Sequence, residues 1–135
     1  MDAFFRQPPG DGAATLADYY DYGRIRAEAL EPLRQRRPAV FVAFDWATGA
    51  PGAPGRAEPA DVVLLDGVSS GAATLGDLVD LAVFVDTPEA VRLERLHGRL
   101  SDDEWDERWL EAEGAYYATR PPSSFDLIVP GTSAG

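Results

Sequence analysis

Residues 81–86 read LAVFVD, and residues 61–66 read DVVLLD. Each run is almost continuously apolar and is closed by an aspartate. A short strand that is apolar on both sides is typical of a parallel sheet with helices on both faces. A third run, DLIV at residues 126–129, is followed by Pro130 and Gly131. These three runs predict the buried strands of a mainly parallel sheet.

Helical patterns precede and separate these strands. Residues 18–35 carry apolar side chains at helical spacing, and Asp18 or Asp21 is suited to cap the start of a helix. The apolar positions are Ile25, Ala29, Leu30 and Leu33. Pro88 suits the first turn of a second helix, and residues 102–117 predict a third, which bears tryptophan.

The remaining segments complete the prediction of the fold. Residues 39–44 form a short apolar run that predicts a strand. Residues 47–59, ATGAPGAPGRAEP, predict an exposed Pro/Gly loop or a hairpin excursion. Strands that alternate with helices indicate an α/β fold with right-handed crossovers, and we expect a single domain over residues 1–135. Ligands of such folds gather where the strands end, as at Asp66 and Asp86.

The composition excludes several classes of function. The chain has 135 residues, is 45% hydrophobic and contains three tryptophans, which suffices for one small core. The formal net charge of -11 argues against nucleic acid or an anionic membrane as a partner. All 12 basic residues are arginine, so no lysine is present to clamp a nucleotide, and cysteine is absent. No apolar run approaches the ~20 residues of a membrane span, and we expect a cytoplasmic protein.

The first candidate site is the end of the DVVLLD run. An acid at the tip of a strand can hold a magnesium ion or its water shell, which makes Asp66 a candidate metal ligand. The alternative is that the strand simply ends in a turn that Asp66 caps.

Three arginines form the second candidate. Arg92, Arg95 and Arg99 are spaced by three and four residues, which places them on one face of a helix. Guanidinium groups in this arrangement suit the negative charge of a transferring phosphoryl group. The alternative is a solvated face that is paired with acidic neighbours.

Aromatic residues beside acids form two more candidates. Asp2 lies next to Phe4 and Phe5, and the pair of an acid and an aromatic can act as a general base and a stacking surface for a nucleoside. Phe44 and Asp45, followed by Trp46, can hold a planar base and accept a hydrogen bond from it. The alternatives are a solvated Asp2, core packing of the aromatics, and a turn at Asp45.

In this order, the motifs of the chain resemble the uridine kinase family of P-loop kinases. The motifs are DAFFR (2–6), YDYGRI (20–25), LEPLR (30–34), FDWATGAP (44–51), VVLLDGVSS (62–70), DLAVFVDTPEAVRLERLHGR (80–99) and WLEAEGAYYATRPPSSFDLIV (109–129). The resemblance implies an ATP- and Mg²⁺-dependent kinase that phosphorylates a hydroxyl of a nucleoside or of another small substrate.

The resemblance also implies roles for residues near the substrate. Asp2 matches the family's general base for the 5'-hydroxyl of the nucleoside. Phe5 stands where the family typically has tyrosine. Phe44 and Asp45 resemble a Tyr-Asp step near the base pocket, so the preference for a pyrimidine does not carry over.

On the phosphate side, Arg95 and Arg99 match arginines of the lid that closes on phosphates. Arg92 begins the same motif, in a lid-like segment over residues 92–104. Asp66 stands at the position of a glutamate and is implied as the metal ligand.

One motif of the family is missing from this chain. P-loop kinases carry G-x-x-x-x-G-K-[ST] between the first strand and the first helix, where backbone amides and the lysine hold the phosphates. The resemblance therefore predicts a partial P-loop NTPase three-layer sandwich that lacks its first, central strand and its first helix. The strands beside the gap would have unpaired edges.

Three functions follow as alternatives. The first is the C-terminal part of an ATP-dependent nucleoside kinase that is inactive as the isolated chain, in which case the in-frame DNA before Met1 should encode a strand, the loop and a helix. The second is a degenerate remnant without cofactor that acts as a binding or regulatory module. The third is a relative of pantothenate kinase or phosphoribulokinase. Homo-oligomers through unpaired strands are also expected.

Overall fold

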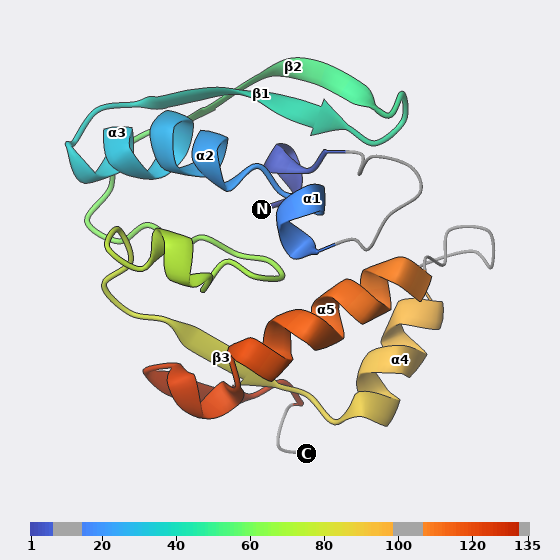
Figure 1. Cartoon of the computed structure of the whole chain (residues 1–135). Helices are drawn as coiled ribbons and strands as arrows, with labels where there is room; N and C mark the ends of the chain where they lie inside the picture. The colour runs from blue at the N-terminus through green and yellow to red at the C-terminus, as the bar shows by residue number, and fades with distance from the viewer. Residues whose placement is uncertain (7–14, 99–106, 133–135) are drawn as a thin grey trace. The chain divides into compact units, whose positions relative to one another are not determined.

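The computed structural model describes residues 1–6, 15–98 and 107–132 (Figure 1). The chain divides into two units, an N-terminal unit (Met1–Asp80) and a C-terminal unit (Leu81–Gly135). Each unit has its own small sheet.

Short helices build one side of the N-terminal unit. After η1 (Asp2–Phe4) and α1 (Leu16–Tyr19), a continuous helical run consists of α2 (Tyr22–Arg24), the π-helical stretch η2 (Ile25–Leu30) and α3 (Glu31–Arg34). Asp21 caps this run, because its carboxylate accepts a hydrogen bond of 3.0 Å from the backbone N–H of Arg24. The predicted helix is confirmed, with Asp21 as the cap. Asp18 instead caps α1, where it accepts hydrogen bonds from Thr15.

A proline explains the π-helical stretch. Pro32 has no N–H, and in a regular α-helix its ring would clash with the carbonyl of Glu28. Widening the preceding turn moves that carbonyl away. Accordingly, the N–H of Glu31 bonds to the carbonyl of Arg26, five residues earlier.

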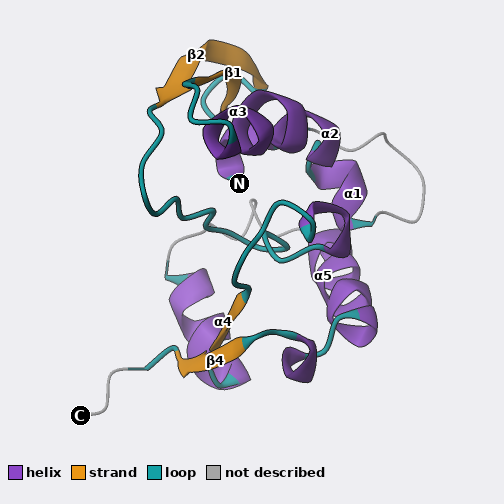
Figure 2. Cartoon of the chain, turned by 90° about the vertical axis from the view of Figure 1, so that its left-hand side faces the viewer, coloured by secondary structure: helices purple, strands orange, loops and turns teal. Residues whose placement is uncertain are grey.

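A hairpin lies over this helical run in both ribbon views (Figures 1 and 2). Strands β1 (Ala39–Asp45) and β2 (Ala50–Ala57) pair antiparallel. The strand predicted at residues 39–44 is confirmed. Of the two structures predicted for residues 47–59, the chain forms the hairpin rather than a loop. Glycine is needed in β2, because a Cβ at Gly55 would overlap the ring of the opposite Phe41.

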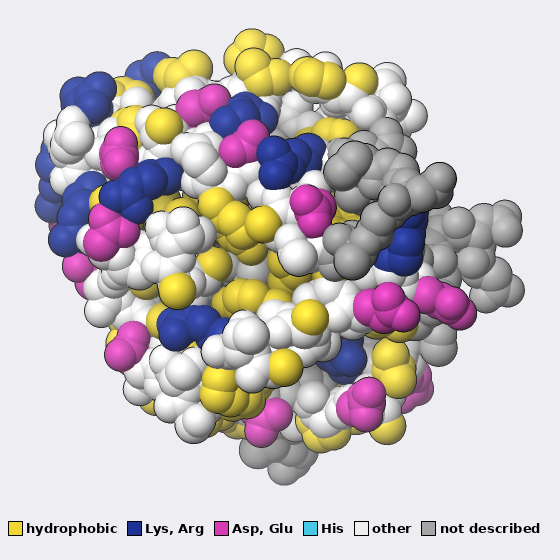
Figure 3. Space-filling view, in the orientation of Figure 1, with side chains coloured by type: hydrophobic (Ala, Val, Ile, Leu, Met, Phe, Trp, Pro, Cys, Tyr) yellow, Lys and Arg dark blue, Asp and Glu magenta, His cyan; other side chains and the backbone are white. Residues whose placement is uncertain are grey.

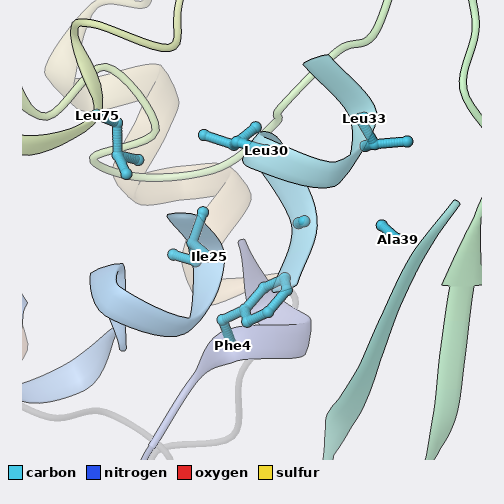
Figure 4. Packing of buried hydrophobic residues seen from close by; sticks show 7 residues of the cluster. Phe4, Ile25, Leu30, Leu33, Ala39 and Leu75 are labelled. Atoms are coloured by element: carbon cyan, nitrogen blue, oxygen red, sulfur yellow. The ribbon is translucent and has the colours of Figure 1, made fainter. Parts of the chain in front are cut away.

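The core of the N-terminal unit lies on both sides of the helical run, with Leu33 and Ala39 towards the hairpin and Leu75 on the other side (Figure 4). Three apolar positions of the predicted helix, Ile25, Leu30 and Leu33, are at most 9% exposed. They pack with Phe4, Ala29, Ala39 and Leu75. The helical periodicity therefore predicted the buried face correctly.

The strand predicted at residues 61–66 is wrong. This segment has no strand pairing, and the side chains of Val62 and Leu64 are 85% and 86% exposed. An apolar run is buried on both sides only inside a sheet that other strands and helices enclose. Among the described residues, the sheet of this unit contains only β1 and β2, so residues 61–66 have no such neighbours.

Ion pairs connect the segment after β2 to the helical run. Arg26 pairs with Asp77, Arg34 with Asp80 at 3.2 Å, and Arg36 with Asp61 at 3.0 Å. Basic and acidic side chains accordingly lie next to one another on this part of the surface (Figure 3). Exposed pairs of this kind contribute ~0 to 1 kcal/mol each, so they orient the segment more than they stabilise it.

The C-terminal unit contains a parallel pair of strands. Strand β3 (Val83–Asp86) pairs with β4 (Leu127–Pro130), and helices α4 (Glu89–His97) and α5 (Glu107–Thr119) lie between them in the chain. The strands predicted at 81–86 and 126–129 are confirmed, as is their parallel pairing. The part of the predicted helix 102–117 before Glu107 lies outside the described residues.

Only one face of this small sheet is covered by aromatic side chains. The ring of Phe84 lies 5.7 Å from that of Tyr117 on α5 and 5.4 Å from that of Phe125. Val83 and Val85 flank Phe84 in β3 and are 42% and 58% exposed, and Leu127, the strand partner of Val83, is 47% exposed. The expectation that both faces are buried is therefore wrong, because two strands and their helices cover a single face.

Over residues 1–6, 15–98 and 107–132, the chain is thus a mixed α/β protein with one antiparallel and one parallel pair of strands. Within the described ranges, no helix has the length and apolar character that crossing a membrane requires.

Candidate functional site

Three aromatic side chains from distant parts of the sequence gather at one end of the hairpin. The ring centroid of Phe5 lies 5.0 Å from that of Phe44 and 4.4 Å from that of Trp46. Phe44 and Trp46 are also 5.0 Å apart, nearly at right angles. We call Phe5, Phe44 and Trp46 the aromatic cluster. Trp46 is 60% exposed, so the cluster offers ring surface to solvent.

Backbone pairing sets the position of Phe5. Phe5 forms an antiparallel bridge with Tyr20. On either side of the bridge, the N–H of Arg6 donates to the carbonyl of Tyr19 at 2.8 Å, and the N–H of Asp21 donates to the carbonyl of Phe4 at 3.1 Å. The N-terminal residues are thereby fixed to the start of the helical run, which points Phe5 toward the hairpin.

A pocket of about 410 Å³ opens beside the aromatic cluster. This volume is within the ~300 to 1,000 Å³ typical of small-molecule sites. The residues that line it are Phe5, Arg6, Arg24, Glu28, Val42, Ala43, Phe44, Gly49, Ala50 and Pro51. The pocket therefore has an aromatic wall from Phe5 and Phe44 and a polar wall from the helical run.

Arg24 and Glu28 form the polar wall. Arg24 donates to Glu28 through Nε at 2.8 Å and through Nη2 at 2.7 Å, and Nη2 also donates to the carbonyl of Val42 at 2.8 Å. These hydrogen bonds lower the pKa of Glu28 below its usual value, and they raise that of Arg24. Glu28 is therefore a carboxylate at neutral pH.

The other cation of the pocket is neutralised nearby. Arg6 donates to the carbonyls of Ala17 and Asp18, and its Nη1 lies 3.7 Å from the carboxylate of Asp21. Two guanidinium groups thus face two carboxylates in and around the pocket. The balance of charge favours an uncharged ligand over an anion.

The acids predicted from the sequence lie near the N-terminus of the chain and at the hairpin turn. Asp2 is exposed at the start of η1. The amino group of Met1, the residue before it, donates a hydrogen bond of 2.7 Å to the backbone carbonyl of Asp66. Asp2 and Asp66 therefore lie in the same region of the N-terminal unit. The carboxylate of Asp45 accepts a hydrogen bond of 2.9 Å from the N–H of Ala47, the contact of a turn residue. Phe5 and Phe44 are the predicted residues that meet in the pocket.

The predicted metal site consists of one described acid. The prediction placed Asp66 at the tip of a strand, but residues 61–66 form no strand, so this premise is wrong and the role of Asp66 in binding Mg²⁺ stays a prediction. Among the described residues, no three His, Cys, Asp or Glu side chains gather into a protein-only metal site.

The predicted phosphate-binding arginines belong to the C-terminal unit. Arg92 donates to Glu113 at 2.8 Å, where the Glu113 side chain is only 12% exposed. Arg95 donates to the carbonyl of Gly131 at 3.0 Å. Arg99 lies outside the described residues. Both described arginines thus have structural partners within their own unit.

No protein-family model matches the chain, and no curated protein matches it.

Sequence reasoning missed Arg24 and Glu28 as pocket residues. Their spacing of four residues on a predicted helix was a signal for an ion pair. Both side chains line the pocket because the hairpin folds over the helical turn that carries them. A contact between two separate segments of the chain cannot be recognised from the pattern of either segment alone.

Proposed function

We propose that the N-terminal unit binds a nucleoside and that the chain is the acceptor-binding part of a uridine kinase-like P-loop kinase. The observation that carries the proposal is the meeting of Phe5 and Phe44 in one pocket. The resemblance to the family named both residues as substrate contacts, although they lie far apart in the sequence.

The chemistry of the pocket supports a planar, uncharged ligand. The aromatic cluster offers a stacking surface, and each base that stacks on an aromatic side chain gains ~1 to 3 kcal/mol. The polar wall supplies hydrogen-bonding groups that orient the ligand. In the proposed intact enzyme, Asp2 accepts the proton of the nucleoside hydroxyl and Asp66 binds Mg²⁺. The resemblance gives Arg92, Arg95 and Arg99 of the C-terminal unit a role at the phosphates of ATP, for which Arg92 and Arg95 would have to leave their present partners.

Calorimetric titration of the chain with uridine and cytidine tests the proposal. We expect binding that Phe44→Ala weakens about tenfold or more, because one stacking surface is lost. Val40→Ala is the matched control, since Val40 lies on the same strand, is 56% exposed and does not line the pocket. The proposal fails if neither nucleoside binds, or if Phe44→Ala and Val40→Ala bind equally well.

The second candidate is a binding or regulatory module that transfers no phosphate. The absence of lysine from the chain favours it for the chain as it stands. Titration with ATP and magnesium separates the two. We expect no micromolar binding without the phosphate-binding loop and its lysine, and micromolar binding would show that the chain holds ATP by other groups.

A further inference from the structure

One edge of strand β1 has no neighbouring strand. In the described part of the chain, β1 pairs only with β2, so its other edge carries backbone groups that no ladder uses. Val42, Ala43 and Phe44 line the pocket, and this segment of β1 therefore gives the pocket a wall of backbone. The direction of its N–H and C=O groups decides what that wall can bind.

Contacts on both sides of β1 fix the direction of these groups. The carbonyl of Val42 accepts a hydrogen bond of 2.8 Å from Arg24, so it points away from β2 and toward the helical run. The carbonyl of Ala43 points toward β2, where a Cβ on Gly52 would lie 3.2 Å from its oxygen. In a trans peptide the N–H points opposite to the preceding carbonyl, so the N–H of Phe44 points away from β2.

The prolines of β2 agree with this arrangement. Pro54 lies opposite Val42 and Pro51 lies opposite Phe44, and neither proline has an N–H to donate across the ladder. Both pairs thus suit the non-hydrogen-bonded positions of an antiparallel ladder, where N–H and C=O point outward. Phe44 therefore directs its N–H and its C=O to the free edge. Over the described residues, no group outside the hairpin bonds to either of them.

The N–H and the C=O of one extended residue lie side by side on the same edge. A facing strand would meet them with one C=O and one N–H. A complete strand would have to displace Arg24 from the carbonyl of Val42, whereas a single ring can bind at Phe44 alone. Uracil presents a ring N–H between two carbonyl oxygens, and cytosine presents an amino group beside a ring nitrogen. Both bases therefore offer an acceptor next to an N–H.

We propose that the backbone N–H and C=O of Phe44 select the ligand of the pocket by pairing with the hydrogen-bonding edge of a base. The N–H of Phe44 donates to a carbonyl oxygen or ring nitrogen of the base, and the C=O of Phe44 accepts from the N–H beside it. The bound ring lies next to Phe5, which lines the same pocket. This inference rests on the proposed nucleoside-binding function and adds the groups that select the base.

Calorimetric titration with methylated nucleosides tests the inference on the unmodified chain. We expect 3-methyluridine, whose ring N–H is blocked, to bind about tenfold or more weakly than uridine. 5-Methyluridine is the matched control, because its methyl group leaves the N–H free, and it should bind like uridine. If uridine and 3-methyluridine bind equally well, the inference is wrong and the nucleoside pocket stands. If no nucleoside binds, the proposed function itself is wrong.

An ester in place of the amide before Phe44 locates the effect at its backbone. Phenyllactic acid at position 44 keeps the aromatic ring and removes the N–H, so we expect uridine to bind about three- to tenfold more weakly. The control is α-hydroxyisovaleric acid in place of Val40. Its N–H points to the same edge, since every second residue of a strand has the same orientation, but Val40 does not line the pocket. Equal uridine affinities of the two ester variants would overturn the role of Phe44.

Discussion

The hydroxyl of Tyr22 donates a hydrogen bond of 2.6 Å to Oγ of Ser69. Ser69 is 3% exposed and has a φ of 63°, in the left-handed region that few residues other than glycine adopt. A strained residue of this kind persists where its surroundings hold it, and here the bond ties the segment after β2 to the helical run. Burial raises the pKa of Tyr22, so the phenol remains a donor at neutral pH.

Removing this hydroxyl should destabilise the protein. We expect Tyr22→Phe to lower the free energy of unfolding by about 1 to 2 kcal/mol, because Ser69 Oγ is left buried without its partner. Urea denaturation measures the change. In Tyr22→Phe with Ser69→Ala, the loss should be smaller than the sum of the two single changes, and strict additivity would show that the bond contributes nothing.

The pair Arg24–Glu28 should make stability depend on pH. The pKa of Glu28 is below its usual 4.5 in the folded state, so its contribution is complete above pH 4.5 and is lost as the pH falls through the folded pKa. We expect the wild-type chain to melt at a higher temperature than Glu28→Gln at pH 7, and the difference to shrink below pH 4.5. A difference that stays constant from pH 7 to pH 3 would contradict this.

The two described arginines of α4 should differ in their effect on stability. Arg92→Ala leaves the nearly buried carboxylate of Glu113 without its cation, and we expect a loss of about 2 kcal/mol. Arg95→Ala removes an exposed contact to a backbone carbonyl and should change stability by less than ~0.5 kcal/mol. Thermal unfolding measures both. Equal losses would show that Arg92 and Glu113 are not coupled, and Glu113→Gln in the Arg92→Ala background should restore part of the stability.

The uncovered face of the β3–β4 sheet should promote self-association. Val85 is 58% exposed there, beside other apolar residues, and apolar strands with free edges pair with other chains. We expect oligomers that grow with concentration in sedimentation velocity, and Val85→Lys should reduce them without lowering the melting temperature. A monomer at all concentrations would contradict the prediction.

The sequence predicted those elements whose pattern depends on their own neighbours. The helical run begins at Asp21 and buries Ile25 and Leu33 as the periodicity requires. The DLIV run forms β4 in the expected parallel pair. The helical run packs on the hairpin that follows it in the chain, whereas β4 finds its partner β3 across the two helices that the alternating pattern predicted.

The predictions that failed depended on more distant partners. Residues 61–66 have the composition of a buried strand, but burial on both sides needs a strand next to them, and composition does not supply one. Val83 was likewise expected to be buried on the strength of its composition, and it is exposed because burial also requires neighbouring elements. For the pocket, the sequence indicated Phe5 and Phe44, whereas Arg24 and Glu28 enter it only through the fold of the hairpin over the helix.

Pro32 lies outside the pocket, yet it bears on the shape of the pocket. The π-helical stretch that precedes it sets the direction in which Glu28 leaves the helix axis. Replacing Pro32 by a residue with a backbone N–H would allow the preceding turn to close into a regular α-helix. The Glu28 side chain would then point in a different direction. The shape of the pocket wall therefore depends on a residue that does not line the pocket, as well as on the residues that do.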